Sequence, residues 1–198
     1  MKNAEEIKVQ HEFCSYEYPG KRPVSFPPSR DHSMVANAKC RLGIDPELLH
    51  LVVFMETCEA EFLVDLLSMV YIGDDHNSEI GVVCGKNTVL LRQVRQALDH
   101  LETFHFYEKD FDLSLLLDSA DLLLSEPREI IASEAVKRRL PLAFFYDGNT
   151  DLPADRRILL DKGCAVFGKD EVELGELCIR LLDQEARRGR MSDAYQTI

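Results

Sequence analysis

The sequence lacks three features that would place it in well-defined classes of protein. It has no run near the roughly 18 apolar residues of a membrane-spanning helix, and its first ten residues are charged instead of apolar. It has no C-x-x-C pair, which zinc sites and redox motifs require. We therefore expect a cytoplasmic protein with reduced thiols, no metal centre and at most peripheral membrane contact. The cysteines are scattered through the chain at Cys14, Cys40, Cys58, Cys84, Cys164 and Cys178.

Basic residues are also scarce. The chain has 23 basic and 35 acidic side chains, which gives a net charge of −12. The averaged field of such a protein repels nucleic acid, so we expect no nucleic-acid partner. A small basic cluster is present at Arg187-Arg188-Gly189-Arg190. Such a cluster is usually a solvated helix end and less often contacts a partner or a lipid head group.

The 198 residues, 45% of them hydrophobic, are enough to bury the core of one domain. Residues 1–48 are rich in proline, which limits regular structure there to short pieces. One such piece is a predicted helix at Ser33–Leu42, capped by Ser29 or Asp31 and ending near Gly43. We interpret residues 1–48 as a linker-like segment, 49–184 as the main domain and 185–198 as a helical tail.

From Leu49 onward, short apolar runs alternate with amphipathic stretches. Strict alternation of strand and helix with short connections implies right-handed crossovers and a parallel sheet covered on both faces. The fold class is therefore α/β, with a Rossmann-like, doubly wound sheet of about six strands. The predicted strands are 51–55, 80–84, 103–107, 122–124, 142–145 and 164–167, and the predicted helices are 59–71, 87–101, 110–118, 128–138, 154–162 and 170–184.

In such a sheet, ligands bind beyond the carboxyl ends of the strands, so the loops that follow the strands hold the candidate site. The loop after the first strand, Glu56 to Ala60, contains no glycine. Nucleotide binders usually have glycines there, because phosphate oxygens must approach backbone N–H groups. The two glutamates of this loop would repel a diphosphate, and the helix dipole offsets only part of that repulsion.

The loop after the fourth strand supplies further candidates. Glu134 falls about two turns into the helix that follows, where its carboxylate suits both hydroxyls of a ribose. Spacing alone favours a different role, an ion pair with Arg138 at i+4. Arg128 is either a cation for a phosphate or an exposed arginine at the helix start. Ser125, in the same loop, completes this group of candidate substrate-binding residues.

Two other regions offer ligand contacts with an ordinary alternative. The stretch 147–153 after the fifth strand suits sugar hydroxyls, but its composition is also that of a solvated loop. Phe106 and Tyr107, at the end of the third strand, offer an aromatic surface to a base, although alternating aromatics are more often core. No residue set has metal-ligand spacing, and no G-x-S-x-G nucleophile elbow is present. We therefore assign no catalytic residue and no metal.

The order of these segments resembles the C-terminal domain of the GT-B glycosyltransferases, the group that includes the diacylglycerol glucosyl- and galactosyltransferases and the peptidoglycan UDP-GlcNAc transferase. The resemblance covers about residues 20 to 195 and depends on several short pieces in register. They are Arg22-Pro23-Val24 with Phe26-Pro27-Pro28, Ala38 to Asp45, Val82 to Asn87, Ala120-Asp121-Leu122 with Ser133-Glu134-Ala135, and Leu160 to Val166.

The resemblance implies a UDP-sugar as the ligand and no other cofactor. It implies that Glu134 holds the ribose with Ser133 beside it, and that Phe106 and Tyr107 form the uracil edge. The sequence departs from the family where the glycine pair that admits phosphates becomes Arg128-Glu129. It departs again in the sugar-contacting segment, whose glutamine and asparagine become Asp151 and Asp155. The family's N-terminal domain, which binds the acceptor and supplies the catalytic base, has no counterpart in this sequence.

Our leading hypothesis is a glycosyltransferase-like domain that is inactive alone and acts as an accessory or regulatory module in glycolipid or cell-wall synthesis. One alternative is the donor-binding subunit of an active, UDP-sugar-dependent transferase whose acceptor domain comes from a partner chain. A second alternative is a structural domain that forms a homodimer, because residues 1–48 would otherwise have no neighbour to pack against. Catalysis needs both halves of a cleft preorganised, so half a cleft is not expected to transfer sugar alone.

Overall fold

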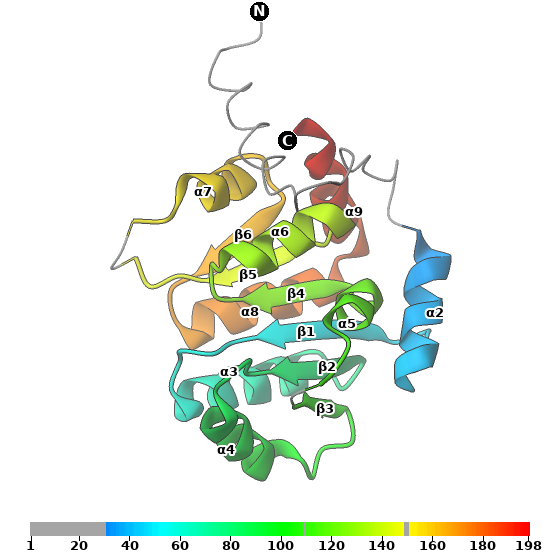
Figure 1. Cartoon of the computed structure of the whole chain (residues 1–198), viewed down its shortest axis with the longest axis vertical. Coiled ribbons are helices and arrows are strands. Elements are labelled where there is room, and N and C mark those ends of the chain that lie inside the picture. The colour runs from blue at the N-terminus through cyan, green and yellow to red at the C-terminus, as the bar shows by residue number, and fades with distance from the viewer. Residues whose placement is uncertain (1–30, 109, 149–150) are drawn as a thin grey trace, which may run out of the picture.

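The computed structural model describes residues 31–108, 110–148 and 151–198. Its strands form one sheet in the order β3-β2-β1-β4-β5-β6, and every pair of neighbours is parallel (Figure 1). This order confirms the predicted Rossmann-like, doubly wound α/β fold. The strands are β1 (Leu49–Phe54), β2 (Ser78–Val83), β3 (Phe104–Tyr107), β4 (Leu122–Ser125), β5 (Leu142–Phe145) and β6 (Ala165–Gly168).

Helices connect successive strands, as the alternating pattern of the sequence predicts. Each of the six predicted helices is present, with ends displaced by at most a few residues. The described helices are α2 (His32–Leu42), α3 (Ala60–Gly73), α4 (Thr88–Leu98), α5 (Leu113–Ser119), α6 (Glu129–Arg138), α7 (Ala154–Asp161), α8 (Glu171–Asp183), α9 (Glu185–Ala194) and the short 3-10 helix η1 (Tyr195–Thr197).

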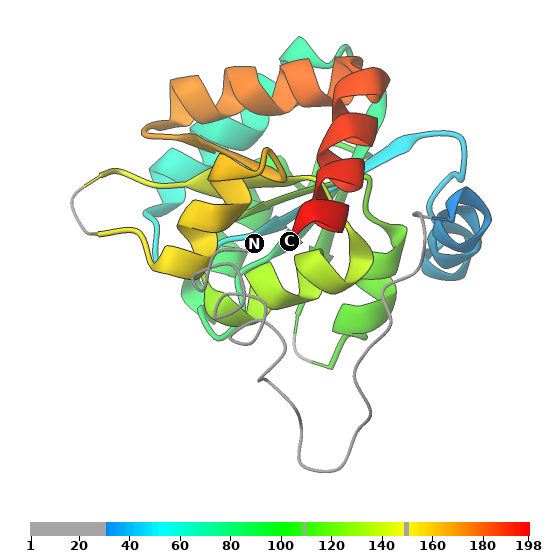
Figure 2. The ribbon, with the colours of Figure 1, turned by 90° about the horizontal axis from the view of Figure 1, so that it is seen from above.

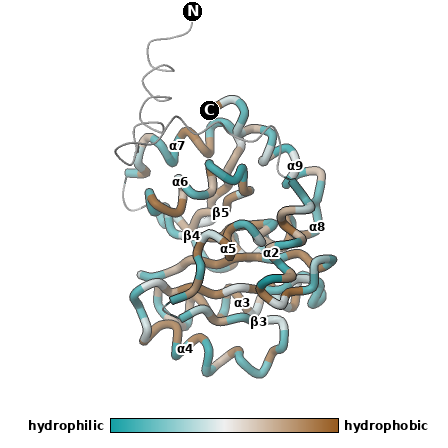
Figure 3. The backbone as a smooth tube through the Cα atoms, turned by 45° about the vertical axis from the view of Figure 1, so that its right-hand side comes forward, coloured by the Kyte–Doolittle hydropathy of each residue, from teal (hydrophilic) through white to brown (hydrophobic). Residues whose placement is uncertain are grey.

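Helices cover both faces of the sheet (Figure 2), and a hydrophobic core lies beneath each layer of helices. Side chains alternate along β1, so Leu51 and Val53 join the core beneath α3, α4 and α8, while Val52 joins the core beneath α5, α6 and α7. Strands buried on both faces are apolar throughout, which explains the short continuous hydrophobic runs of the sequence. In Figure 3 the hydrophobic colour lies along the strands, whereas α9 is mostly hydrophilic. No helix in the described part of the chain is long and apolar enough to cross a membrane.

Helix α2 is part of this domain. Asp31 is its N-cap and accepts from the Ser33 amide (2.9 Å), and Gly43 ends it in the left-handed conformation (φ 76°). The helix packs on α5, and the buried Lys39 Nζ pairs with Asp121 Oδ2 at 2.7 Å. The described part of the segment 1–48 therefore has a neighbour within its own chain, and residues 1–30 lie outside the described residues.

Helix α9 crosses the amino-terminal edge of the sheet from one layer to the other (Figure 2). Met191 belongs to the core on the α3/α8 face, and Tyr195, just after α9, belongs to the core on the α5/α6 face. The Tyr195 hydroxyl donates to the carbonyl of Leu140 (2.7 Å). Arg188 donates to the carbonyls of Leu181 and Leu182 at the end of α8 (2.6 and 2.5 Å), which satisfies acceptors that a helix end leaves free.

Candidate functional site

The candidate site lies where the strand order reverses, between β1 and β4. The chain passes from β1 outward to β3 on one side and from β4 outward to β6 on the other, so the loops after β1 and β4 both begin at this seam on the carboxyl edge. The amide of Met55 donates to the carbonyl of Val83, the last residue of β2 (3.0 Å), and the amide of Glu126 donates to the carbonyl of Phe54, the last residue of β1 (3.4 Å). The loops after β1, β2 and β4 therefore meet at one place.

Glu126 fastens the loop after β1. Its Oε1 atom accepts from the backbone amide of Thr57 (2.6 Å) and from the Thr57 hydroxyl (2.5 Å). Its side chain is only 7% exposed. A carboxylate oxygen is therefore bonded to a loop amide, the kind of donor that binds phosphate oxygens in nucleotide sites.

Glu56 holds the loop after β2 in the same way, through a hydrogen bond from a backbone amide. Its Oε1 accepts from the amide of Lys86 (2.7 Å), and its backbone carbonyl accepts from the side chain of Asn87 (2.9 Å), the N-cap of α4. Gly85, the residue before Lys86, has a φ of 51°. A Cβ atom at this position would lie 1.6 Å from Glu56 Oε1. Glycine is required here because a side chain would overlap the Glu56 carboxylate and because φ is positive.

Arg128 joins the two glutamates. Its guanidinium pairs with Glu56 Oε2 and, through Nε, with Glu126 Oε2 at 3.0 Å. We call Glu56, Thr57, Glu126 and Arg128 the carboxylate lock. Two carboxylates and one guanidinium leave it with a net charge of −1, which opposes a diphosphate. Of the two glutamates predicted to repel a diphosphate, Glu56 belongs to the lock, whereas Glu59 is the exposed N-cap of α3.

The lock holds Glu126 ionised. Burial alone would raise the pKa of this carboxyl, but the hydrogen bonds from Thr57 and Arg128 outweigh burial and lower the pKa below its usual value. The nearby thiols behave in the opposite way. Burial raises the pKa of Cys58 and of Cys84 to about 12, so both are protonated and unreactive.

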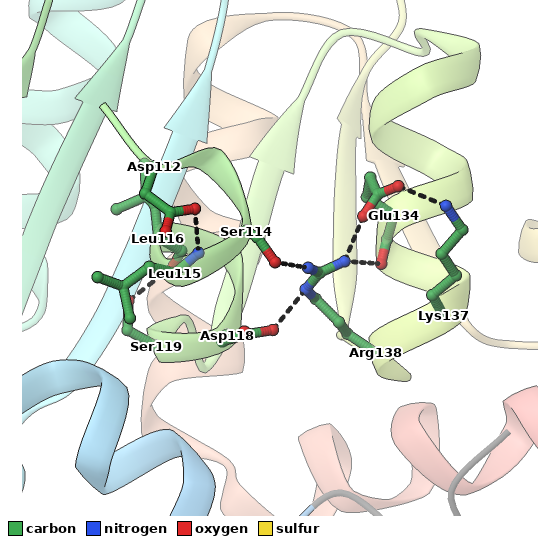
Figure 4. Close-up of polar contacts among 9 residues, drawn as sticks. All are labelled: Asp112, Ser114, Leu115, Leu116, Asp118, Ser119, Glu134, Lys137 and Arg138. Atoms are coloured by element: carbon green, nitrogen blue, oxygen red, sulfur yellow. Dashed lines mark hydrogen bonds and ion pairs between the residues drawn. The ribbon is translucent and has the colours of Figure 1, made fainter. Parts of the chain in front are cut away.

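The predicted ribose ligand, Glu134, is engaged in ion pairs within α6 (Figure 4). One oxygen pairs with Lys137 (2.5 Å) and the other with Arg138, so the i+4 pair that spacing favours is present. Arg138 also binds Asp118 Oδ1 (2.7 Å) and Ser114 Oγ (2.7 Å) on α5. Burial opposes ionisation of Glu134, yet the bonds from Lys137 and Arg138 lower its pKa. A ribose at this carboxylate would have to replace these bonds.

The end of β3, the predicted base edge, is covered by an arginine. The guanidinium of Arg95 lies over the Phe106 ring (5.4 Å to its centroid), donates to the Phe106 carbonyl (3.3 Å) and pairs with Glu108 (2.5 Å). Tyr107 packs against Phe111 (5.8 Å between ring centroids). The backbone acceptor of Phe106 is thus already bonded within the protein.

The remaining predicted site residues are divided between the carboxyl edge and its surroundings. Ser125 is fully buried and donates to the carbonyl of Glu126 (2.8 Å), so its hydroxyl is used internally. Asp155 pairs with Arg156, whose Nε donates to the carbonyl of Pro127 (3.1 Å), which brings the start of α7 beside the lock. Ser133 is half-buried on α6, and Asp151 is exposed. Among the described residues, no group of metal-ligating side chains is present.

No protein-family model matches the sequence, and no curated protein matches it at a significant level. Solved structures match its fold. A protein assigned as a UDP-N-acetylglucosamine 2-epimerase from Listeria monocytogenes superposes with a TM-score of 0.64 and 14% identity, over 84% of this chain and 43% of its own. MurG of Acinetobacter baumannii gives a TM-score of 0.55 and 14% identity, over 91% of this chain and 53% of its own. This chain therefore spans about half of each of these proteins.

A third solved structure consists of a single domain, and this chain matches nearly all of it. The C-terminal CMP-Kdo binding domain of WaaA from Acinetobacter baumannii gives a TM-score of 0.60 at 11% identity, and the match covers 84% of this chain and 96% of that domain. The chain has the fold of a GT-B C-terminal domain. In this GT-B-type domain the switch point between β1 and β4 is filled by the carboxylate lock, and the β3 edge is covered by Arg95.

Three residues of this GT-B-type domain were not among the predicted site residues: Glu126, Arg95 and Arg156. Glu126 directly follows β4, and a carboxylate at that point of a nucleotide-type fold was the signal that would have marked it. No comparable signal exists for Arg95 or Arg156, because each reaches a carbonyl on another element. The predicted roles of Glu134, Phe106 and Tyr107 toward a nucleotide stay predictions.

Proposed function

We propose that the chain is a donor-type domain of the GT-B architecture whose nucleotide-sugar site is occupied by its own side chains, and that it works as an accessory or regulatory module. Its original ligand class is a UDP-sugar, and its setting is glycolipid or cell-wall synthesis in the cytoplasm. The described cysteines are free thiols, which agrees with a reducing compartment.

The observation that carries the proposal is the bonding of the Thr57 and Lys86 amides by Glu126 and Glu56. A diphosphate would have to displace both carboxylates. The bonds it gained to these amides would then replace bonds already made, each worth about 1.5–3 kcal/mol when one partner is charged. It would also meet the negative charge of the lock, so net binding is weak or absent.

The direct test is isothermal titration of the protein with UDP, UDP-glucose, UDP-galactose and UDP-GlcNAc. We expect no measurable heat of binding from the unchanged protein. The paired variant Glu56→Gln with Glu126→Gln keeps the shape of the lock and removes two negative charges beside Arg128. We expect it to gain affinity for inorganic pyrophosphate and UDP by about tenfold or more, as the loss of two close like charges allows.

The matched control is Glu59→Gln with Glu61→Gln. This pair changes the net charge equally at exposed positions around the start of α3, outside the lock. An equal gain in the control would mean that overall charge, not the lock, limits binding. Tight binding of any UDP-sugar by the unchanged protein would contradict the proposal outright.

One observation favours a second candidate, the donor-binding subunit of a two-chain transferase. The Arg128 side chain is 40% exposed, so it is accessible to a phosphate if a partner chain completes the cleft. This candidate predicts sugar transfer only when the partner is present. Transfer that persisted in an Arg128→Ala variant would count against it, because the lost glycine contacts would then have no substitute.

A further inference from the structure

A basic groove lies at the opposite, amino-terminal edge of the sheet. It is formed by the turn after α7, the start of β6 and helix α9, which lie side by side in Figures 1 and 2. Its volume is about 370 Å³. The cations that line it are Lys162, Arg187 and Arg190, and its apolar lining includes Val166, Met191 and Ala194. We call these six residues the basic groove.

The three cations have no acidic partner in the part of the chain that the structure describes. Acidic residues are near in sequence, with Asp161 beside Lys162 and Asp193 three residues after Arg190, yet neither forms an ion pair with them. Arg188, which lies in the same basic cluster as Arg187 and Arg190, differs from them. Arg188 bonds two carbonyls at the end of α8 and serves the fold, whereas Arg187 and Arg190 line the groove.

The negative net charge of the protein favours a compact anion over an extended anionic surface as the ligand of the basic groove. With a charge of −12, the molecule as a whole repels an extended anionic surface such as a bilayer or an acidic protein. Exposed charges interact over only about 8–10 Å at physiological salt. A compact anion inside the groove therefore senses mainly the three cations. Arginine pairs with phosphate through two parallel hydrogen bonds, and a groove of this size suits a small ligand.

We propose that the basic groove binds a small phosphate monoester that carries an apolar group, with the phosphate at Lys162, Arg187 and Arg190 and the apolar group against Val166, Met191 and Ala194. The groove and the carboxylate lock lie at opposite ends of the parallel strands, because β6 starts at the groove and β1 and β4 end at the lock. The proposed binding site is therefore separate from the nucleotide-type site.

Titration of the full ¹⁵N-labelled chain with phenyl phosphate, followed by amide chemical shifts, tests the proposal. We expect saturable shifts of Gly163, Arg187 and Arg190, and weaker binding of inorganic phosphate, which lacks the apolar group. The paired variant Arg187→Gln with Arg190→Gln should weaken phenyl phosphate by about tenfold or more, because it removes two charge-assisted contacts.

The matched control is Arg41→Gln with Arg92→Gln, two exposed arginines on α2 and α4 that line no part of the groove. An equal loss in the control would overturn the proposal, since it would reduce the effect to overall charge. The absence of saturable shifts would also overturn it, as would equal affinity for inorganic phosphate. Binding to vesicles with 30% phosphatidylglycerol, without binding of phenyl phosphate, would identify a membrane surface instead and equally overturn it.

Discussion

Glu126 is a buried acid that its neighbours keep ionised. Its pKa lies below the value of the unfolded chain, so it contributes stability that is present above the unfolded pKa and is lost as pH falls through the folded pKa. We expect Glu126→Gln to lower the free energy of unfolding at pH 7 by about 1–3 kcal/mol. The gap to the unchanged protein should narrow as pH falls below 4.5, the value of an unperturbed glutamate.

Urea denaturation followed by circular dichroism, from pH 7 to pH 3, checks this prediction. Glu61→Gln is the control, because Glu61 is exposed and forms no ion pair among the described residues. A gap between Glu126→Gln and the unchanged protein that stays constant over the acid range would contradict a depressed pKa.

His50 is the second residue with a defined pH effect. Its Nδ1 lies 2.9 Å from Ser119 Oγ, which itself donates to the Leu116 carbonyl, so the hydrogen-bond pattern assigns the proton to Nδ1. Nε2 is buried and has no hydrogen-bond partner among the described residues. Burial lowers the pKa of His50 to about 3. The folded protein therefore keeps this ring neutral at pH values where the unfolded chain binds a proton.

The direction in which His50 changes stability with pH follows from the numbers of protons that the folded and unfolded states bind. Between the unperturbed pKa of 6.5 and the folded value of about 3, the unfolded state holds more protons, so His50 makes stability fall as pH falls. Its maximum contribution is about 1.4 kcal/mol per pH unit. A His50→Gln variant should lose this part of the slope, measured by urea denaturation between pH 7 and pH 5, above the range where carboxyls titrate. An unchanged slope would show that His50 is not held neutral.

At the scale of elements, the loop between β2 and α4 depends on Gly85. A side chain there would have to move the Glu56 carboxylate, breaking its bonds to Lys86 and Arg128. We expect Gly85→Ala to destabilise the fold by about 2–3 kcal/mol, through left-handed backbone strain together with the lost bonds.

Gly43→Ala is the matched control in thermal or urea unfolding. Gly43 also has a positive φ, 76°, but a Cβ atom there would meet nothing within 4 Å. It should cost about 1–2 kcal/mol for backbone strain alone. Equal losses in the two variants would mean that the Glu56 contacts contribute nothing.

The secondary structure was predictable because each element carries its own periodicity. Strands such as β4 and β5 are continuous apolar runs, and helices such as α4 show apolar residues at helical spacing. The errors lie at the ends. The run at 51–55 hid the first two residues of β1, Leu49 and His50, because a buried histidine breaks an apolar pattern.

The site was predictable only in part, because its bonds depend on strand order. Thr57 and Glu126 are 69 residues apart and meet only because β1 lies beside β4. The sequence indicated that the loop after β1 is unsuited to phosphate, because the loop contains two glutamates and no glycine. It marked Glu126 only as a carboxylate directly after β4 and did not indicate that this carboxylate would bond the Thr57 amide of the loop after β1.

At the scale of the whole molecule, α9 and the turn after it connect the two cores. Tyr195→Phe removes one buried hydrogen bond, to the Leu140 carbonyl, and should cost about 1 kcal/mol. Met191→Ala should cost about 2–5 kcal/mol, as truncation of a buried methionine does. Because the two residues belong to opposite faces of one sheet, we expect each variant to unfold in a single transition with coincident fluorescence and circular-dichroism curves.

Met34→Ala, a truncation of an exposed methionine on α2, is the control and should change the free energy of unfolding little. Separate transitions by the two probes would show that the faces unfold independently. That result would contradict the role of α9 as a connection between them.

The carboxylate lock and α9 act at opposite ends of the strands. At one end, the contacts of the lock connect the β1–β3 half of the sheet to the β4–β6 half across the seam between β1 and β4. At the other end, α9 spans both faces of the sheet. The lock therefore joins the two halves of the sheet at the seam, whereas α9 joins its two faces. Opening the seam at its carboxyl edge would require the contacts of Glu126 with Thr57 and of Arg128 with Glu56 to break.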